Sequence, residues 1–190
     1  REWERYAWIK ARVLNQGVNL QAEWLRALQE ISRPFVFRKY LDFGAINAMR
    51  DLHAQIRREV ARKEMAEHIK LGPGGIREIE FMAQVFQLIR GGRDPALQAR
   101  PTLTVLALLA ERRLLPAENE RELAGAYDFL RRLEHRLQYV NDAQTHRLPG
   151  NGQDRLQIAR SMGFADWPAF AGVLDGHRAI VSRCFEEVFS

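Results

Sequence analysis

The chain has little of what several large classes of protein require. It contains one cysteine, Cys184, so no disulfide can form within it, which fits a reducing compartment. No apolar run approaches the ~20 residues that a membrane-spanning helix needs, and no signal peptide is recognisable. These absences favour a cytoplasmic protein with no membrane partner. The chain begins at Arg1, within a helical pattern and without an initiator methionine, so we expect a fragment of a longer protein.

The sequence also lacks the patterns that hold a metal ion or a catalytic centre. Glu78 and Glu80 are two residues apart, so on a helix their side chains point about 200° apart and cannot share one ion. There is no Asp-x-Asp, no Gly-Ser-Asp turn and no Ser/His/Asp arrangement, and His135 and His146 have no partner at metal-ligand spacing. We therefore expect no catalytic and no metal-binding residue in this chain, which would instead hold or complete a site.

What the sequence does contain is an ordinary globular composition with a moderate positive charge. Its 190 residues, 46% hydrophobic and 28% charged, can bury a core as one large domain or two small ones. A net charge of +5 with a pI near 9.8 fits nucleic acid, nucleotide phosphates or an acidic protein as partner. Nucleic acid is the weakest of the three, because no nucleic-acid-binding motif and no basic groove interleaved with aromatic residues is present.

Helical periodicity dominates the chain, and no convincing strand alternation is found. We predict an all-α bundle of about six to eight helices, with long antiparallel helices near 43–68, 76–90 and 116–141. Further helices are expected at 2–14, 20–31, 103–114, 153–161 and 166–189. Pro34 is expected to interrupt the chain after the second of these, and Thr102 is expected to cap the third at its N-terminus.

A glycine-rich corner, residues 70–81, reads Lys-Leu-Gly-Pro-Gly-Gly-Ile-Arg-Glu-Ile-Glu-Phe. Glycines are placed where the backbone turns sharply or closely approaches another group. A glycine-rich turn that opens a helix can also point free N–H groups at a phosphate. The spacing matches neither a Walker A loop nor a dinucleotide fingerprint, so a helix–helix corner and a ligand loop both stay open.

The predicted helix after this corner carries a polar stripe. Arg77, Glu80, Gln84 and Gln87 fall within an arc of about 80°, and the rest of the circumference is apolar. Such a helix is central to a bundle, so its polar groups need partners. Either they form a structural network inside the bundle, or they face a cleft that meets a ligand or a neighbouring domain.

Five runs of the chain, taken together, resemble one family. They are Arg1-Glu-Trp-Glu-Arg-Tyr-Ala-Trp-Ile-Lys-Ala-Arg12, Arg33-Pro-Phe-Val-Phe-Arg-Lys-Tyr-Leu-Asp-Phe43, Ile69-Lys-Leu-Gly-Pro-Gly-Gly-Ile-Arg-Glu-Ile-Glu-Phe81, Gln87-Leu-Ile-Arg-Gly-Gly-Arg93 and Gln144-Thr-His-Arg-Leu-Pro149. In this order they resemble the bifunctional glutamine synthetase adenylyltransferase/adenylyl-removing enzymes of bacteria. The Lys-x-Gly-Pro-Gly-Gly-x-Arg core is shared with the related uridylyltransferase of the PII signal protein. The last two runs favour the N-terminal, adenylyl-removing half.

The resemblance implies two nucleotidyltransferase domains of the DNA polymerase β type, each followed by a helical domain. The N-terminal half would remove AMP from a tyrosine of glutamine synthetase by phosphorolysis, releasing ADP, and so regulate nitrogen metabolism. ATP or ADP and Mg²⁺ are the implied cofactors, with the metal-binding carboxylates upstream of this chain. Residues 1–32 would belong to the end of the upstream catalytic domain and its connection, and residues 33–190 to the helical bundle.

The resemblance also gives the basic residues a role near a nucleotide. The candidates near the nucleotide or its phosphates are Arg5, Lys10, Arg12, Lys70, Gly72, Gly74, Gly75 and Arg77, with Glu80, Gln84 and Gln87 as the polar stripe of the cleft. Expected partners are glutamine synthetase, the PII protein and the upstream nucleotidyltransferase domain. The alternative is a non-catalytic module that docks PII or glutamine synthetase.

Overall fold

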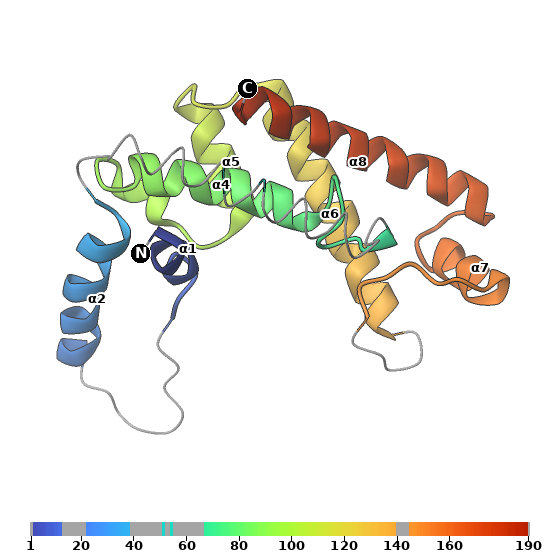
Figure 1. Cartoon of the computed structure of the whole chain (residues 1–190), viewed down its shortest axis with the longest axis horizontal. Helices are drawn as coiled ribbons and strands as arrows, with labels where there is room; N and C mark the ends of the chain where they lie inside the picture. Colours follow the sequence, from blue (N-terminus) through green and yellow to red (C-terminus); the bar gives the residue numbers. More distant parts are fainter. Residues whose placement is uncertain are drawn as a thin grey trace. The chain divides into compact units, whose positions relative to one another are not determined.

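A computed structural model gives the fold (Figure 1), and it describes residues 2–12, 22–38, 51, 54, 67–139 and 145–189. The described residues are helical and contain no strand beyond one isolated bridge between His68 and Arg147, which confirms the all-α prediction. The elements are α1 Glu2–Trp8, α2 Ala22–Val36, α4 Ile76–Arg90, η2 Pro95–Gln98, α5 Thr102–Glu111, α6 Ala117–Tyr139, α7 Gly152–Ser161 and α8 Trp167–Phe189.

The chain divides into two compact units that interleave in sequence. Unit 1 comprises Arg1–Leu52 and Ala83–Leu114, and unit 2 comprises His53–Met82 and Leu115–Ser190. Helix α4 is divided between them, with residues 76–82 in unit 2 and 83–90 in unit 1. The boundary expected between residues 32 and 33 falls inside α2.

Unit 1 is organised by short-range turns around the end of α4. Gly91 ends this helix, and a Cβ at that position would lie 2.7 Å from Phe37 Cδ1, so the missing side chain makes room for the aromatic ring. Asp94 then caps η2 by accepting a hydrogen bond from Ala96 N, and its carboxylate also pairs with Arg112. The sequence signal for the end of this helix at Gly91-Gly92 is therefore confirmed, with a packing reason.

Unit 2 is built on α6 and α8, which run in opposite directions. Near one end Asn119 Nδ2 donates to Glu187 Oε2 over 2.8 Å, while farther along Phe129 stacks on Phe170 with ring centroids 6.0 Å apart. Phe129 also lies 4.5 Å from the His177 ring. Aromatic side chains thus fill the space between the two helices, where each buries a large apolar area.

The long helices predicted at 76–90 and 116–141 are confirmed as α4 and α6. The helix predicted at 43–68 lies mostly outside the described residues. Asp51 and Ala54 are helical there, whereas Glu67 and His68 already belong to the turns that precede α4.

Three finer predictions are wrong. The first helix ends at Trp8 instead of residue 14. Ile9 N and Ala11 N donate hydrogen bonds to the carbonyls three residues earlier, Tyr6 O and Trp8 O, as in a turn and not as in an α-helix. Pro34 lies within α2, in its last turn, and the helix continues to Val36. Thr102 is the first residue of α5 and not its cap, since its hydroxyl lies 3.2 Å from Lys10 Nζ.

Candidate functional site

The glycine-rich corner is a tight turn whose backbone bonds close on themselves. Gly72 N donates to His68 O over 2.7 Å, and Gly75 N donates to Gly72 O over 3.0 Å. The first amides of α4, those of Ile76 and Arg77, donate back to the carbonyls of residues 69 and 70. These bonds satisfy donors that a helix N-terminus otherwise leaves free.

The glycines of the corner are required by close packing against α8. Gly74 has φ +67°, and a Cβ there would lie 2.6 Å from Arg178 Cα. Arg178 Nε in turn donates to Pro73 O over 3.0 Å. A Cβ on Gly75 would lie 2.7 Å from Ile69 O, within the turn itself. Both glycines therefore have a structural reason that is independent of any ligand.

The amide of Gly74 is also occupied, because it donates to Glu78 Oε2 over 3.0 Å. Glu78 is buried and acts as an acceptor within the first turn of α4. The amides of Gly72, Gly74 and Gly75 thus all donate within the chain, and a phosphate would have to displace these bonds. Contact of this loop with a nucleotide remains a prediction.

Lys70 lies in an ionic network around Glu134 of α6. The Glu134 side chain is 3% exposed, and its Oε1 lies 3.4 Å from Lys70 Nζ and 3.2 Å from His146 Nδ1, while Arg131 pairs with Oε2. A buried carboxylate needs such partners, because moving its charge from water into the protein interior costs roughly several kcal/mol. The ammonium predicted to meet a phosphate is thus already paired with a carboxylate.

His68 joins this network to the corner. Its Nδ1 accepts hydrogen bonds from Leu71 N at 3.1 Å and Lys70 N at 3.3 Å, and its ring centroid lies 5.4 Å from that of His146. Burial lowers the pKa of His68, and the neighbouring charges of His146, Arg147 and Lys70 lower it further. The neutral imidazole is therefore the form that holds the corner.

Two members of the polar stripe of α4, Gln87 and Glu80, form hydrogen bonds within the chain. Gln87 is fully buried, and its Nε2 donates to Leu97 O at 2.6 Å and Ala99 O at 2.7 Å, which fixes η2. Glu80 Oε1 accepts from Tyr127 at 3.3 Å, and Gln84 is 5% exposed. Both glutamine side chains are thus buried in this chain, and a cleft formed by the stripe stays a prediction. Arg77 is half-buried and has interaction partners of its own.

Two of the five basic residues predicted near the phosphates, Arg5 and Lys10, hold α1 and the turn after it in place. Arg5 is 5% exposed and its guanidinium donates to Phe35 O at 3.2 Å and Val36 O at 3.0 Å, so it satisfies carbonyls at the C-terminus of α2. Lys10 Nζ binds Arg100 O and Thr102 Oγ1 at the start of α5. Arg12, by contrast, is exposed.

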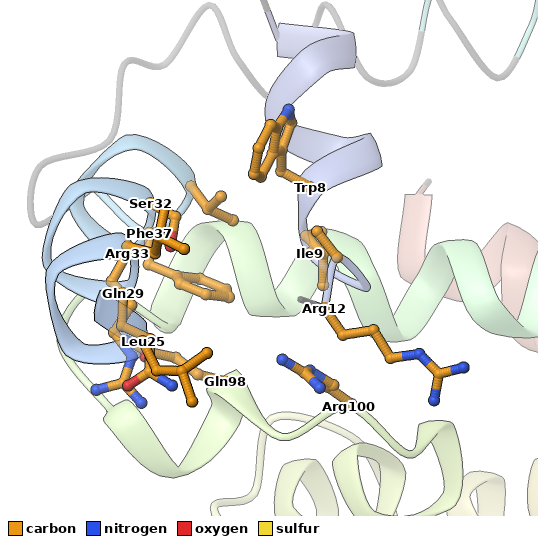
Figure 2. A pocket seen from close by; sticks show the side chains of 13 residues that line it. Trp8, Ile9, Arg12, Leu25, Gln29, Ser32, Arg33, Phe37, Gln98 and Arg100 are labelled. Carbon is orange, nitrogen blue, oxygen red and sulfur yellow. The ribbon is translucent and has the colours of Figure 1, made fainter. Parts of the chain in front are cut away.

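Arg12 lines a cavity of about 680 Å³ within unit 1, the arginine pocket (Figure 2). Trp8, Ile9 and Arg12 come from α1 and the residues that follow it, and Leu25, Gln29, Ser32 and Arg33 from α2, with Phe37 just beyond the helix. Gln98 and Arg100 complete the wall. Among the residues that the structure describes, none forms an ion pair or hydrogen bond with the guanidinium groups of Arg12, Arg33 or Arg100.

Of the three arginines that line this pocket, the sequence singles out Arg12 as a candidate and gives no signal for Arg33 or Arg100. Arg33 directly precedes Pro34, and Arg100 lies in a loop that contains two prolines, so neither position belongs to a periodic pattern. The three residues are far apart in sequence, so only the fold brings them to one cavity.

The described residues contain no group of three His, Cys, Asp or Glu side chains that could hold a metal ion. No helix in the described ranges is long and apolar enough to cross a membrane.

Comparison with known proteins gives a consistent result. Residues 50–189 match the family model described as GlnD PII-uridylyltransferase. The whole chain is 68% identical over 189 residues to a bifunctional glutamine synthetase adenylyltransferase/adenylyl-removing enzyme of Aromatoleum aromaticum. Proteins of the same name are 59% identical in Chromobacterium violaceum and 58% identical in Nitrosomonas eutropha, again over the whole chain. The chain spans about a fifth of the length of these relatives, 20% in each case.

Proposed function

We propose, since the chain belongs to the family of bifunctional glutamine synthetase adenylyltransferase/adenylyl-removing enzymes, that it is the helical part of the adenylyl-removing half. In the parent protein this half would cleave adenylyl-tyrosine of glutamine synthetase with phosphate and release ADP. The chain would support and line that site, and an upstream domain would supply the metal-binding carboxylates. This chain alone would not catalyse the reaction.

The observation that carries this proposal is the way α1 is mounted. Arg5 fixes α1 to the end of α2, and Lys10 fixes the turn after α1 to the start of α5, while Arg12 remains exposed at a pocket. A helix held by two cationic side chains and presenting a third is suited to place one positive charge beside a phosphate. Such a preorganised cation stabilises charge that develops on a transferring phosphoryl group.

The corner would have a different role in the same half. Because its amides and Lys70 are engaged within the chain, it would act as a rigid support for α4 and would contribute only the side chain of Arg77. In that reaction an oxygen of inorganic phosphate would attack the adenylyl phosphorus, the bond to the tyrosine oxygen would break, and ADP would leave. In this chain Arg12 is the residue best placed to meet these phosphate groups.

The test is steady-state phosphorolysis of adenylylated glutamine synthetase by the parent enzyme. Arg12→Ala and Arg77→Ala are each compared with Arg26→Ala, which removes a positive charge from an exposed position of α2 outside the arginine pocket. We expect kcat/KM to fall about tenfold or more for Arg12→Ala, as for the loss of a charge-assisted contact, and to remain unchanged for Arg26→Ala. Full activity of both Arg12→Ala and Arg77→Ala, with the fold intact by circular dichroism, would refute the supporting role.

One observation favours the second candidate, a docking module for PII or glutamine synthetase. Helix α2 exposes four large apolar side chains at helical spacing, Trp24, Leu28, Ile31 and Phe35, of which Ile31 is 74% exposed. On this alternative, Trp24→Ser and Ile31→Ser would weaken binding of purified PII or glutamine synthetase to the parent enzyme. Unchanged affinities for both proteins would leave the first candidate.

A further inference from the structure

We propose that the arginine pocket binds an organic anion in which phosphate or carboxylate groups are joined to a flat apolar body. The pocket lies within unit 1 and needs no residue from elsewhere. It shares only Arg12 with the proposed function, and the inference concerns binding by this chain itself, so either can fail without the other.

The positive charge of the arginine pocket favours an anionic ligand. Arg12, Arg33 and Arg100 all line it, and no described carboxylate pairs with them. Elsewhere in the described chain arginines do find carboxylates, as Arg112 does with Asp94 and Arg183 with Glu122. Three positive charges along one cavity give it a positive potential, and this potential favours the binding of an anion. Guanidinium groups bind phosphate and carboxylate oxygens bidentately.

The size and the apolar walls of the pocket favour an organic ligand over a small inorganic ion. A cavity of about 680 Å³ lies in the range typical of sites for small organic molecules. Figure 2 shows Trp8 and Ile9 on the α1 side and Leu25 and Phe37 on the α2 side, with the Arg100 guanidinium in the lower part of the view, between the α2 side chains and Arg12. An inorganic phosphate would meet the arginines but leave these apolar walls in water. A ligand with a flat apolar body would cover both.

The pocket is also held in shape before any ligand binds. Arg5 joins α1 to the last carbonyls of α2, where two walls of the pocket begin. Lys10 Nζ binds the carbonyl of Arg100 itself and so fixes the backbone from which that guanidinium extends. A preformed site avoids part of the entropic cost of ordering on binding.

The test is isothermal titration of the 190-residue chain with simple probes. 1-Naphthyl phosphate and 1-naphthoate combine a flat apolar body with each type of anion, and inorganic phosphate and 1-naphthol each carry one half of the chemistry. We expect at least one of the two combined probes to bind roughly tenfold more tightly than either half, and more weakly as NaCl is raised. ADP is titrated in parallel, and tighter binding of ADP than of 1-naphthyl phosphate would assign the site to nucleoside phosphates.

Variants locate the binding. Arg100→Gln and Trp8→Ser are each expected to lower the affinity for the combined probe about tenfold. Arg26→Gln, a matched loss of charge on α2 outside the pocket, should leave this affinity unchanged. Arg33→Gln replaces Arg100→Gln if that variant does not fold by circular dichroism. Equal affinity for the wild-type chain and the arginine variants would overturn the proposal. So would equal binding of inorganic phosphate and the combined probes, or no binding of any combined probe up to about 10 mM, which is weaker than most specific small-molecule sites.

Discussion

Gly74 is the residue at which backbone conformation and packing both forbid a side chain. Its φ of +67° is unfavourable for other residues, and a Cβ would overlap the backbone of α8 at Arg178. The clash is with backbone atoms, which cannot rotate away as a flexible side chain can. The turn and the helix α8 therefore depend on each other at this single position.

We expect Gly74→Ala to lower the free energy of unfolding by about 2–4 kcal/mol, from strain plus overpacking. Urea denaturation followed by circular dichroism measures it. Gly172→Ala on α8 is the control, because nothing lies within 4 Å of its Cβ, and the helix should gain about 0.5–1 kcal/mol. Equal stability of the two variants would contradict the packing described for the corner.

His68 makes the stability of the corner depend on pH. Its pKa is lowered from 6.5 in the folded chain, so the unfolded chain binds a proton more tightly. The contribution of neutral His68 is fully present above pH 6.5 and is lost as pH falls below 6.5 toward the lowered pKa. His177, whose pKa is also lowered by burial, contributes in the same direction.

The expected result is a fall in unfolding free energy between pH 7.5 and pH 5, with a smaller fall in His68→Asn. Asparagine keeps an acceptor near the position of Nδ1, facing the amides of residues 70 and 71, but does not titrate. His177→Asn separates the second contribution. An identical pH dependence in the wild type and His68→Asn would show that the pKa of His68 is the same in the folded and unfolded states.

At the scale of elements, the C-terminus of α2 depends on Arg5, which lies 30 and 31 residues before the two carbonyls that it binds. Arg5 satisfies the carbonyls of Phe35 and Val36, the acceptors that the C-terminus of a helix leaves open. Its positive charge also suits the negative end of the helix dipole.

We expect Arg5→Met to destabilise unit 1 by about 1.5–3 kcal/mol, as for the loss of a buried hydrogen bond with a charged donor. Methionine keeps the apolar stem, so the change isolates the guanidinium. Hydrogen exchange of the α2 amides measures the effect locally, and Arg26→Met on the exposed side of α2 is the control. Faster exchange in both variants to the same degree would argue against a specific cap.

At the scale of the whole chain, α4 gives buried residues to two compact units. Phe81 and Met82 belong to unit 2, and Val85 and Leu88 belong to unit 1. All four side chains are buried. A helix forms cooperatively, so loss of packing along one half lowers the stability of the other half. The stabilities of the two units are therefore coupled through one element.

The corresponding prediction concerns Leu88→Ala, which should cost about 2–5 kcal/mol through the cavity that it leaves in unit 1. Tryptophan fluorescence in variants that keep only Trp8 or only Trp167 reports units 1 and 2 separately. We expect the urea midpoint to fall for both reporters. A shift confined to Trp8 would mean that the units unfold independently.

The helical class and the ends of α4 were available from the sequence, because they depend on local signals. Apolar periodicity marks α4, α6 and α8, and the glycines on either side of α4 mark where it stops. The continuation of α2 past Pro34 was not available, because its last carbonyls accept hydrogen bonds from Arg5, which is distant in the chain. Likewise, the helical-wheel position of Gln87 predicts only that it lies on the polar stripe, and the hydrogen bond to Leu97 of η2 is visible only in the fold.

The sequence alone determined the family, the helical character and the glycine-rich turn, since each of these resides in runs of neighbouring residues. Only the tertiary structure decided which of the basic residues are engaged and which face a pocket. Arg5, Lys10 and Lys70 have the same charge as Arg12, but each has partners at long range. Arg12 lies in a pocket with Arg33 and Arg100, which no spacing in the sequence connects. Charge is a property of a residue, whereas its availability to a ligand depends on the packing of the residues around it.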